Sequence, residues 1–162
     1  MEELSERINS LPVSATLAMA AKARELKNNG IDVIGLSLGE PDFNTPEYIK
    51  DSAIKAVNDN YNSYSPVDGY ADLKDAICTK FKRDNNLNYK PSQIVVSTGA
   101  KQSIANLCMV LLNPGDEVLL PAPYWVSYSA IATLAEAKSV IIPSSIETDF
   151  KITPKQLEAA IT

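Results

Sequence analysis

Apolar residues recur along much of the chain with the three- and four-residue spacing of amphipathic helices. In the first such stretch, Ser14 has the side chain of a helix N-cap, and Gly30 suits the left-handed position that follows a helix. The pattern predicts helices from Ser14 to Gly30, from Pro46 to Asn58, from Leu73 to Asn85, around Ile104–Leu111, from Tyr124 to Ala137 and from Thr153 onward.

Short apolar runs separate the later helices. The runs Ile94–Val96, Glu117–Pro121 and Ser139–Pro143 have the length and composition of buried strands, so that strands alternate with helices. This order predicts an α/β fold with a mostly parallel sheet, here of three strands. Because such a sheet has exposed edges and an incomplete core, we expect the sequence to be the beginning of a larger enzyme.

An earlier segment, Val33–Gly39, alternates apolar residues with Gly35, Ser37 and Gly39. The alternation predicts a strand, and its glycine-bearing face leaves room for a ligand or another backbone to approach closely. The strand should end at Pro41, which lacks the N–H that a continued strand needs.

Composition and charge argue against several classes of binding partner. The 162 residues are 45% hydrophobic and carry 15 Lys and Arg against 20 Asp and Glu, a net charge of −5. A chain of this charge without a basic run is not expected to bind nucleic acid or anionic lipid. No apolar run approaches the roughly 18 residues of a membrane helix, so we expect no membrane partner.

The sequence contains no histidine, which excludes imidazole metal sites and His-based nucleophile pairs, and we expect no metal. Its two cysteines, Cys78 and Cys108, fall on the apolar faces of predicted helices. We interpret them as reduced core residues of a cytoplasmic protein.

The segment Ile94–Gln102 reads IVVSTGAKQ and has the order strand, tight turn, helix. Small residues at Ser97, Gly99 and Ala100 let the first N–H groups of the helix point outward unpaired, an arrangement that favours a bound phosphate. A lysine at a helix start, here Lys101, is unfavourable unless an anion compensates it. The alternative is an ordinary strand-to-helix turn, and the phosphate-loop motif of nucleotide-binding proteins is absent.

The only tryptophan, Trp125, follows the strand Glu117–Pro121 at the end where parallel sheets bind ligands. The stiff Pro121-Ala122-Pro123 segment could present its indole to a planar ring, although a lone tryptophan can equally be a core residue.

Six motifs together resemble, in order and spacing, the N-terminal part of class I (fold type I) pyridoxal-phosphate aminotransferases of the bacterial aspartate aminotransferase type. The resemblance covers essentially the whole chain. The matching segments are Leu11–Ser14, Gly39–Phe43, Tyr64–Pro66 with Gly69, Ser97–Gln102, Asn113–Val118 and Pro123–Trp125. The resemblance implies a three-layer α/β fold, with residues 1–45 as an N-terminal arm and small-domain segment and residues 46–162 as the first part of the large, cofactor-binding domain.

The same resemblance implies roles for individual residues. The turn at Gly99, Ala100 and Lys101 should bind the phosphate of pyridoxal 5′-phosphate, and Trp125 should stack over its pyridine ring. Tyr64 should reach the cofactor phosphate of the partner subunit in a homodimer.

Substrate contacts follow from the resemblance as well. Gly39 should lie near the α-carboxylate of the substrate, and Trp125 should line the substrate site. Lys101 stands where aspartate-using relatives place a cation for the distal carboxylate, which implies aspartate and 2-oxoglutarate as substrates. Val13 and Ser14 match a mobile entrance segment.

No catalytic residue is assigned in this chain. The Schiff-base lysine of the family lies in a Ser-Lys segment followed by Arg-x-Gly, and its pyridinium aspartate in an Asp-Glu-x-Tyr strand; neither string occurs here. We therefore expect this chain alone not to transaminate. Two alternatives stay open: a non-catalytic binding or assembly module, and another pyridoxal-phosphate enzyme such as a carbon-sulfur lyase.

Overall fold

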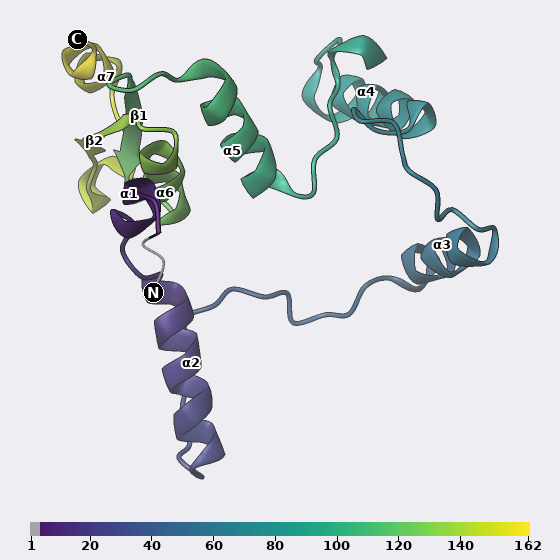
Figure 1. Cartoon of the computed structure of the whole chain (residues 1–162), viewed down its shortest axis with the longest axis horizontal. Coiled ribbons are helices and arrows are strands. Elements are labelled where there is room, and N and C mark those ends of the chain that lie inside the picture. Colours follow the sequence, from purple (N-terminus) through teal and green to yellow (C-terminus); the bar gives the residue numbers. More distant parts are fainter. Residues whose placement is uncertain (1–3) are drawn as a thin grey trace. The chain divides into compact units, whose positions relative to one another are not determined.

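The computed structural model describes residues 4–162 and divides the chain into two compact units (Figure 1). One unit combines the residues up to Ser37 with Thr98–Thr162, and the other is Leu38–Ser97. Figure 1 shows α2, α5 and both strands in the first unit and α3 and α4 in the second.

The structure confirms the predicted helices and adds a short one at the start. The elements are α1 (Glu6–Asn9), α2 (Ala15–Asn28), α3 (Glu47–Asn58), α4 (Ala71–Asn85), α5 (Ala100–Leu111), α6 (Ser127–Leu134) and α7 (Pro154–Ala160), with 3₁₀ turns η1 (Pro91–Gln93) and η2 (Ile146–Thr148) and strands β1 (Glu117–Ala122) and β2 (Lys138–Pro143).

Side-chain caps mark the starts of α2 and α7. The Ser14 hydroxyl accepts the N–H of Leu17 at 3.4 Å and caps α2, and Thr153 caps α7 in a reciprocal pair with Gln156. Some predicted boundaries were wrong. Pro46 precedes α3 as its N-cap and is not its first residue, and α6 is shorter than the predicted Tyr124–Ala137, running from Ser127 to Leu134 between the caps Val126 and Ala135.

Strands β1 and β2 form a parallel pair whose register runs from Glu117 opposite Lys138 to Ala122 opposite Pro143. Helix α6 connects them and packs on both, which confirms the predicted parallel α/β arrangement (Figure 1). At the start of the pair, the ammonium of Lys138 donates to the Glu117 carboxylate at 2.8 Å.

The expected number of strands was wrong. Residues 94–96 and 33–39 are extended or irregular but belong to no sheet, and the described part of the chain contains only β1 and β2. A strand exists only when a neighbour accepts and donates its backbone hydrogen bonds. Ile34 and Leu36, which should have been half-buried in a strand, are 86% and 91% exposed.

The core is small and lies mainly around β1, α6 and β2. Its members are Leu120, Ile131, Ala132, Ala135 and Ile142, with Ile94 buried in the second unit. Cys78 and Cys108 are free but only half-buried, so their expected full burial was wrong: the apolar faces of α4 and α5 are incompletely covered. No helix within residues 4–162 combines the length and the apolar character needed to cross a bilayer.

Candidate functional site

The start of helix α5 carries unpaired backbone donors. Gly99 is the N-cap, with φ +83° and ψ 162°, and its carbonyl accepts the N–H groups of Gln102 and Ser103 at 3.2 and 3.3 Å. The N–H of Thr98 is taken by the side-chain oxygen of Gln102. Within residues 4–162, the N–H groups of residues 99–101 donate no hydrogen bond, so three donors at the positive end of the helix remain available.

The space in front of this turn is open. A Cβ added to Gly99 would meet no atom within 4 Å, and no side chain caps the helix. The turn is therefore neither filled by a side chain nor satisfied by another part of the described chain, which are the two conditions for an anion to approach its N–H groups.

Lys101 and Trp125 lie in contact beside this turn. The ammonium nitrogen of Lys101 is 4.4 Å from the centroid of the Trp125 ring, a cation–π contact. Tyr128 meets the indole edge to face, with centroids 5.9 Å apart and an angle of 90°. Trp125 remains 45% exposed, so it is not a core residue, and within residues 4–162 Lys101 makes no salt bridge to a carboxylate.

Proteins of known type are similar to this chain in sequence and in fold. The family model for aminotransferase class I and II matches residues 31–162. The chain belongs to this family. An aspartate/prephenate aminotransferase of Nitrosomonas europaea is 52% identical over 160 residues, which are 99% of this chain and 40% of that protein.

Two solved aspartate aminotransferases share the fold. The enzyme of Rhizobium meliloti has a TM-score of 0.95 and 44% identity over 100% of this chain and 40% of its own. The Thermus thermophilus enzyme with maleate has a TM-score of 0.95 and 40% identity over 100% of this chain and 42% of its own. The aminotransferase resemblance and the α/β fold class are thus confirmed, and the chain spans about 40% of the length of these relatives.

Class I and II aminotransferases imply pyridoxal 5′-phosphate, and the donor set at α5 has the right chemistry for it. Three unpaired backbone N–H groups at a helix N-terminus suit a doubly charged phosphate. An exposed indole next to them suits a planar heterocycle. Gly99, Ala100, Lys101 and Trp125 therefore lie close together, three of them consecutive and the fourth in contact through Lys101.

Val13 and Ser14, which were expected to match an entrance segment, line a groove together with residues that follow Trp125. Val13 and Ser14, with their neighbours, face Val126 and Ser127 across a groove of about 210 Å³. Val126 and Ser127 were not assigned from the sequence. The signal that could have found them is their position directly after Trp125.

Gly39 and Tyr64 belong to the second unit. No atom would lie within 4 Å of a Cβ at Gly39, so the bare backbone expected there is present. Tyr64 is fully exposed, and within residues 4–162 its ring has no aromatic partner. The roles of both residues stay predictions.

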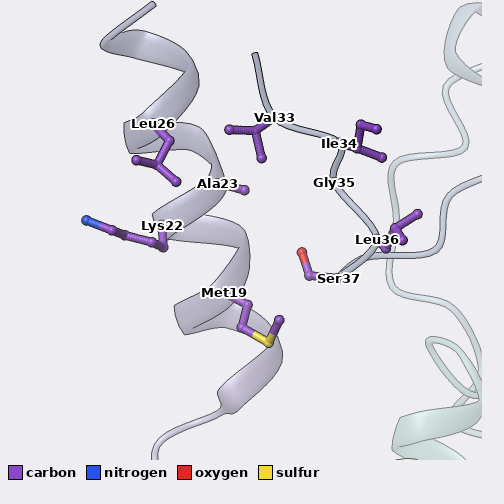
Figure 2. A pocket seen from close by; sticks show the side chains of 9 residues that line it. All are labelled: Met19, Lys22, Ala23, Leu26, Val33, Ile34, Gly35, Leu36 and Ser37. Carbon is purple, nitrogen blue, oxygen red and sulfur yellow. The ribbon is translucent and has the colours of Figure 1, made fainter. Parts of the chain in front are cut away.

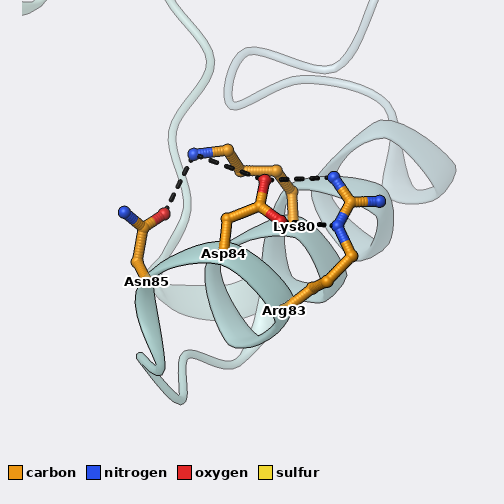
Figure 3. Close-up of polar contacts among 4 residues, drawn as sticks. All are labelled: Lys80, Arg83, Asp84 and Asn85. Atoms are coloured by element: carbon orange, nitrogen blue, oxygen red, sulfur yellow. Dashed lines mark hydrogen bonds and ion pairs between the residues drawn. The ribbon is translucent and has the colours of Figure 1, made fainter.

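One further groove and one charge cluster lie elsewhere in residues 4–162. A groove of about 350 Å³ between α2 and residues 33–37 is lined mainly by apolar side chains (Figure 2). At the end of α4, Arg83 donates two hydrogen bonds to Asp84 and lowers the pKa of that carboxyl, in an exposed cluster with Lys80 and Asn85 (Figure 3). In the part of the chain that the structure describes, no three His, Cys, Asp or Glu side chains gather as a metal site would require.

Proposed function

We propose that the whole protein is a pyridoxal-phosphate-dependent aminotransferase that moves the amino group of an amino acid, aspartate first, to 2-oxoglutarate. The observation that carries this proposal is the group of unpaired N–H donors at residues 99–101 beside the Lys101–Trp125 contact. The similarity to aspartate and aspartate/prephenate aminotransferases supports the reaction class.

The cofactor supplies an aldehyde and an electron-withdrawing ring that together make amino transfer accessible. In this chain, the N–H groups of Gly99, Ala100 and Lys101 bind the phosphate, aided by the dipole of α5. The indole of Trp125 packs on the pyridine ring. An indole has two faces, so the ammonium above one face leaves room for a ring on the other.

Lys101 selects dicarboxylic substrates. Its ammonium has no carboxylate partner within the described residues, and it is held at the indole rather than in bulk solvent. A carboxylate entering beside Trp125 would therefore complete a charge-assisted hydrogen bond at low ordering cost. The similar Thermus thermophilus enzyme was solved with maleate, a dicarboxylate, which supports this assignment.

Gly39 and Tyr64 complete the site in the assembled protein. The bare backbone at Gly39 admits the α-carboxylate of the substrate, and Tyr64 donates its hydroxyl to the cofactor phosphate of the partner subunit. We propose a homodimer on this basis, and a cytoplasmic location because both cysteines are free. The full exposure of Tyr64 is consistent with a side chain that acts on another subunit.

The motif that carries the proton-transferring lysine in this family does not occur in the 162 residues. No Ser-Lys segment followed by Arg-x-Gly is present. Because Lys101 belongs to the turn that would hold the phosphate, it would lie away from the aldehyde of the bound cofactor. Catalysis by the whole protein therefore needs residues outside this sequence, and the 162 residues alone should not transaminate.

The test measures amino transfer from aspartate to 2-oxoglutarate by the whole protein with added pyridoxal 5′-phosphate. We expect turnover, and we expect Lys101→Met to raise the KM for aspartate much more than the KM for alanine. A matched control is Lys80→Met, which removes an exposed lysine that lies 5.7 Å from the Phe81 centroid. Release of pyruvate, ammonia and a thiol from a thioether amino acid, without amino transfer, would replace the proposal by a lyase function.

A further inference from the structure

Tyr128 contacts both the backbone and the side chain of Trp125. Trp125 lies in the loop between β1 and α6, and Tyr128 lies in the first turn of α6. The N–H of Tyr128 donates to the carbonyl of Trp125 at 2.9 Å. The ring of Tyr128 packs on the indole at the same time, with centroids 5.9 Å apart and ring planes at 90°. The first turn of α6 therefore holds the loop residue at two points.

The helix that carries Tyr128 is part of the core. Helix α6 packs on β1 and on β2. Tyr128 precedes Ile131 and Ala132 by three and four positions, and residues at this spacing share one face of a helix. Ile131 is 7% exposed and Ala132 is 0% exposed, so this face is the buried one. The ring of Tyr128 is itself half-buried, so it has less rotational freedom than an exposed side chain and can support the indole.

The contact between the two rings depends on their orientation. Perpendicular aromatic rings attract each other because the positive edge of one meets the negative face of the other. A rotation of the Trp125 indole about its side-chain bonds would lose this geometry. An aliphatic side chain at position 128 could fill the same space, but without a ring it would not favour one orientation of the indole over another.

The orientation of the indole also determines where Lys101 is held. Lys101 lies in the first turn of α5, and α5 packs against α6. Its ammonium nitrogen is 4.4 Å from the centroid of the Trp125 ring. A cation–π contact forms at the face of a ring, so a turned indole would no longer offer that face to the ammonium. Tyr128, Trp125 and Lys101 thus form a chain of contacts within one compact unit.

We propose that Tyr128 is a positioning residue of the substrate site, which orients the Trp125 indole and, through it, the ammonium of Lys101. The substrates that depend on it are dicarboxylic amino acids, because their distal carboxylate is the group that meets Lys101. A monocarboxylic amino acid lacks this group and is less sensitive to the position of the ammonium. The inference rests on the proposed function for the substrate, and on the contacts of Tyr128 for the mechanism.

Steady-state kinetics of the whole protein test this with Tyr128→Leu, which removes the ring, and Tyr128→Phe, which keeps it. We expect Tyr128→Leu to raise the KM for aspartate about fivefold relative to the KM for alanine. Tyr128→Phe should keep the ratio of the unmodified protein. A smaller fraction of folded enzyme lowers kcat for both substrates and leaves this ratio unchanged. An unchanged ratio in Tyr128→Leu, or an equal shift in Tyr128→Phe, overturns the positioning role.

The matched control is Tyr89→Leu in the other unit. Tyr89 and Phe81 form an edge-to-face pair of similar geometry, with centroids 5.7 Å apart and ring planes at 62°. Tyr89→Leu removes the same kind of contact from a different aromatic pair, and the KM ratio should stay unchanged. An equal shift in Tyr128→Leu and Tyr89→Leu would contradict the proposal. Tyr128→Gln also lacks the ring, should shift the ratio as leucine does, and replaces leucine if that variant fails to fold.

A Lys101→Met background tests whether Tyr128 acts through Lys101. In that background Tyr128→Leu should no longer change the ratio of the two KM values, because the ammonium that it positions is gone. Additive effects of the two substitutions on this ratio would show that Tyr128 and Lys101 act independently, and would overturn the chain of contacts.

A spectroscopic measurement separates the inference from the proposed function. The near-ultraviolet circular dichroism of Trp125, obtained by subtracting the spectrum of Trp125→Phe, reports the surroundings of the indole and needs no added cofactor. We expect this signal to be lost in Tyr128→Leu and kept in Tyr128→Phe and Tyr89→Leu, with the far-ultraviolet spectrum unchanged in all three. A signal kept in Tyr128→Leu overturns the positioning role. If the unmodified protein transfers no amino group but the signal is lost in Tyr128→Leu alone, the proposed function fails and the orientation of Trp125 by Tyr128 stands.

Discussion

The ammonium of Lys101 lies 4.4 Å from the centre of the Trp125 indole, and both residues border the unpaired N–H groups at the start of α5. A lysine in the first turn of a helix opposes the helix dipole by about 0.3–1 kcal/mol, and a cation–π contact at an exposed site offsets about 0.5–1 kcal/mol. The two effects nearly cancel, so the lysine can be kept at this position without a bound anion.

This balance predicts how substitutions of Lys101 and Trp125 change the free energy of unfolding, singly and together. Lys101→Met should change the free energy of unfolding by less than about 0.5 kcal/mol, because it loses the indole contact but relieves the dipole. In a Trp125→Leu background, the same change should stabilise the protein. Urea unfolding of the four proteins measures the coupling between residues 101 and 125. A coupling of zero would show that the contact contributes nothing.

The backbone donors can be removed one at a time. Proline is tolerated at the first position of a helix, so Ala100→Pro should keep α5 and delete one of the three unpaired N–H groups. A hydrogen bond to a charged group contributes about 1.5–3 kcal/mol, and we expect phosphate affinity to fall accordingly. Isothermal titration calorimetry with inorganic phosphate measures the change.

The matched control for that substitution is Glu47→Pro, at the first position of α3. It places the same residue type at the same helical position in the unit that does not contain the 98–101 turn. If both proline variants bind phosphate as tightly as the unmodified protein, the N–H group of Ala100 is not a phosphate ligand.

Two neighbouring isoleucines on β2 differ in burial, and their substitutions should differ in cost. Ile142 is 3% exposed and Ile141 is 45% exposed, because successive strand residues point to opposite faces. Ile142→Ala should cost about 2–5 kcal/mol of unfolding free energy, as is usual for a buried large-to-small change. Ile141→Ala should cost less than half as much. Comparable losses in urea unfolding would show that β2 is not packed as described.

The helices were predictable from the sequence because the residues that determine a helix, its caps and its apolar stripe, lie within the helix or next to it. Ser14 caps α2 through a bond to an N–H three residues away, and Thr153 does the same for α7. The apolar stripe and the cap together determine such an element without reference to the rest of the chain. The start of α6 was predicted three residues too early, at Tyr124 instead of Ser127. The apolar spacing alone does not show at which residue a helix begins after a proline-containing loop.

Strands were harder to predict, because a strand depends on its neighbours. Ile94–Val96 and Glu117–Pro121 have similar apolar character, but only the second pairs with another segment. The turn at residues 98–101, which is proposed to bind phosphate, was singled out by its small residues, and Trp125 by its place after β1. The close approach of Gly69 to Val96, where a Cβ added to Gly69 would lie 2.5 Å from Cγ2 of Val96, was not found, because nothing in the spacing of the two residues indicates that they touch.

The ion pair between Asp68 and Lys74, beside the turn closed by the Gly69 N–H and the Pro66 carbonyl, should respond to acid. The hydrogen bond from Lys74 lowers the pKa of Asp68 below the usual value for a carboxyl. A carboxyl whose pKa is lower in the folded than in the unfolded state stabilises the fold fully above its unfolded pKa of about 3.9, and this contribution is lost as the pH falls through the folded value. Asp68→Asn should therefore lower the urea midpoint at pH 7, and the difference from the unmodified protein should shrink below about pH 4. In a Lys74→Gln background, the pH dependence of that difference should largely disappear, because the partner that lowers the pKa is gone. A difference that stays constant from pH 7 to pH 3 would show that Asp68 does not stabilise the turn through its charge.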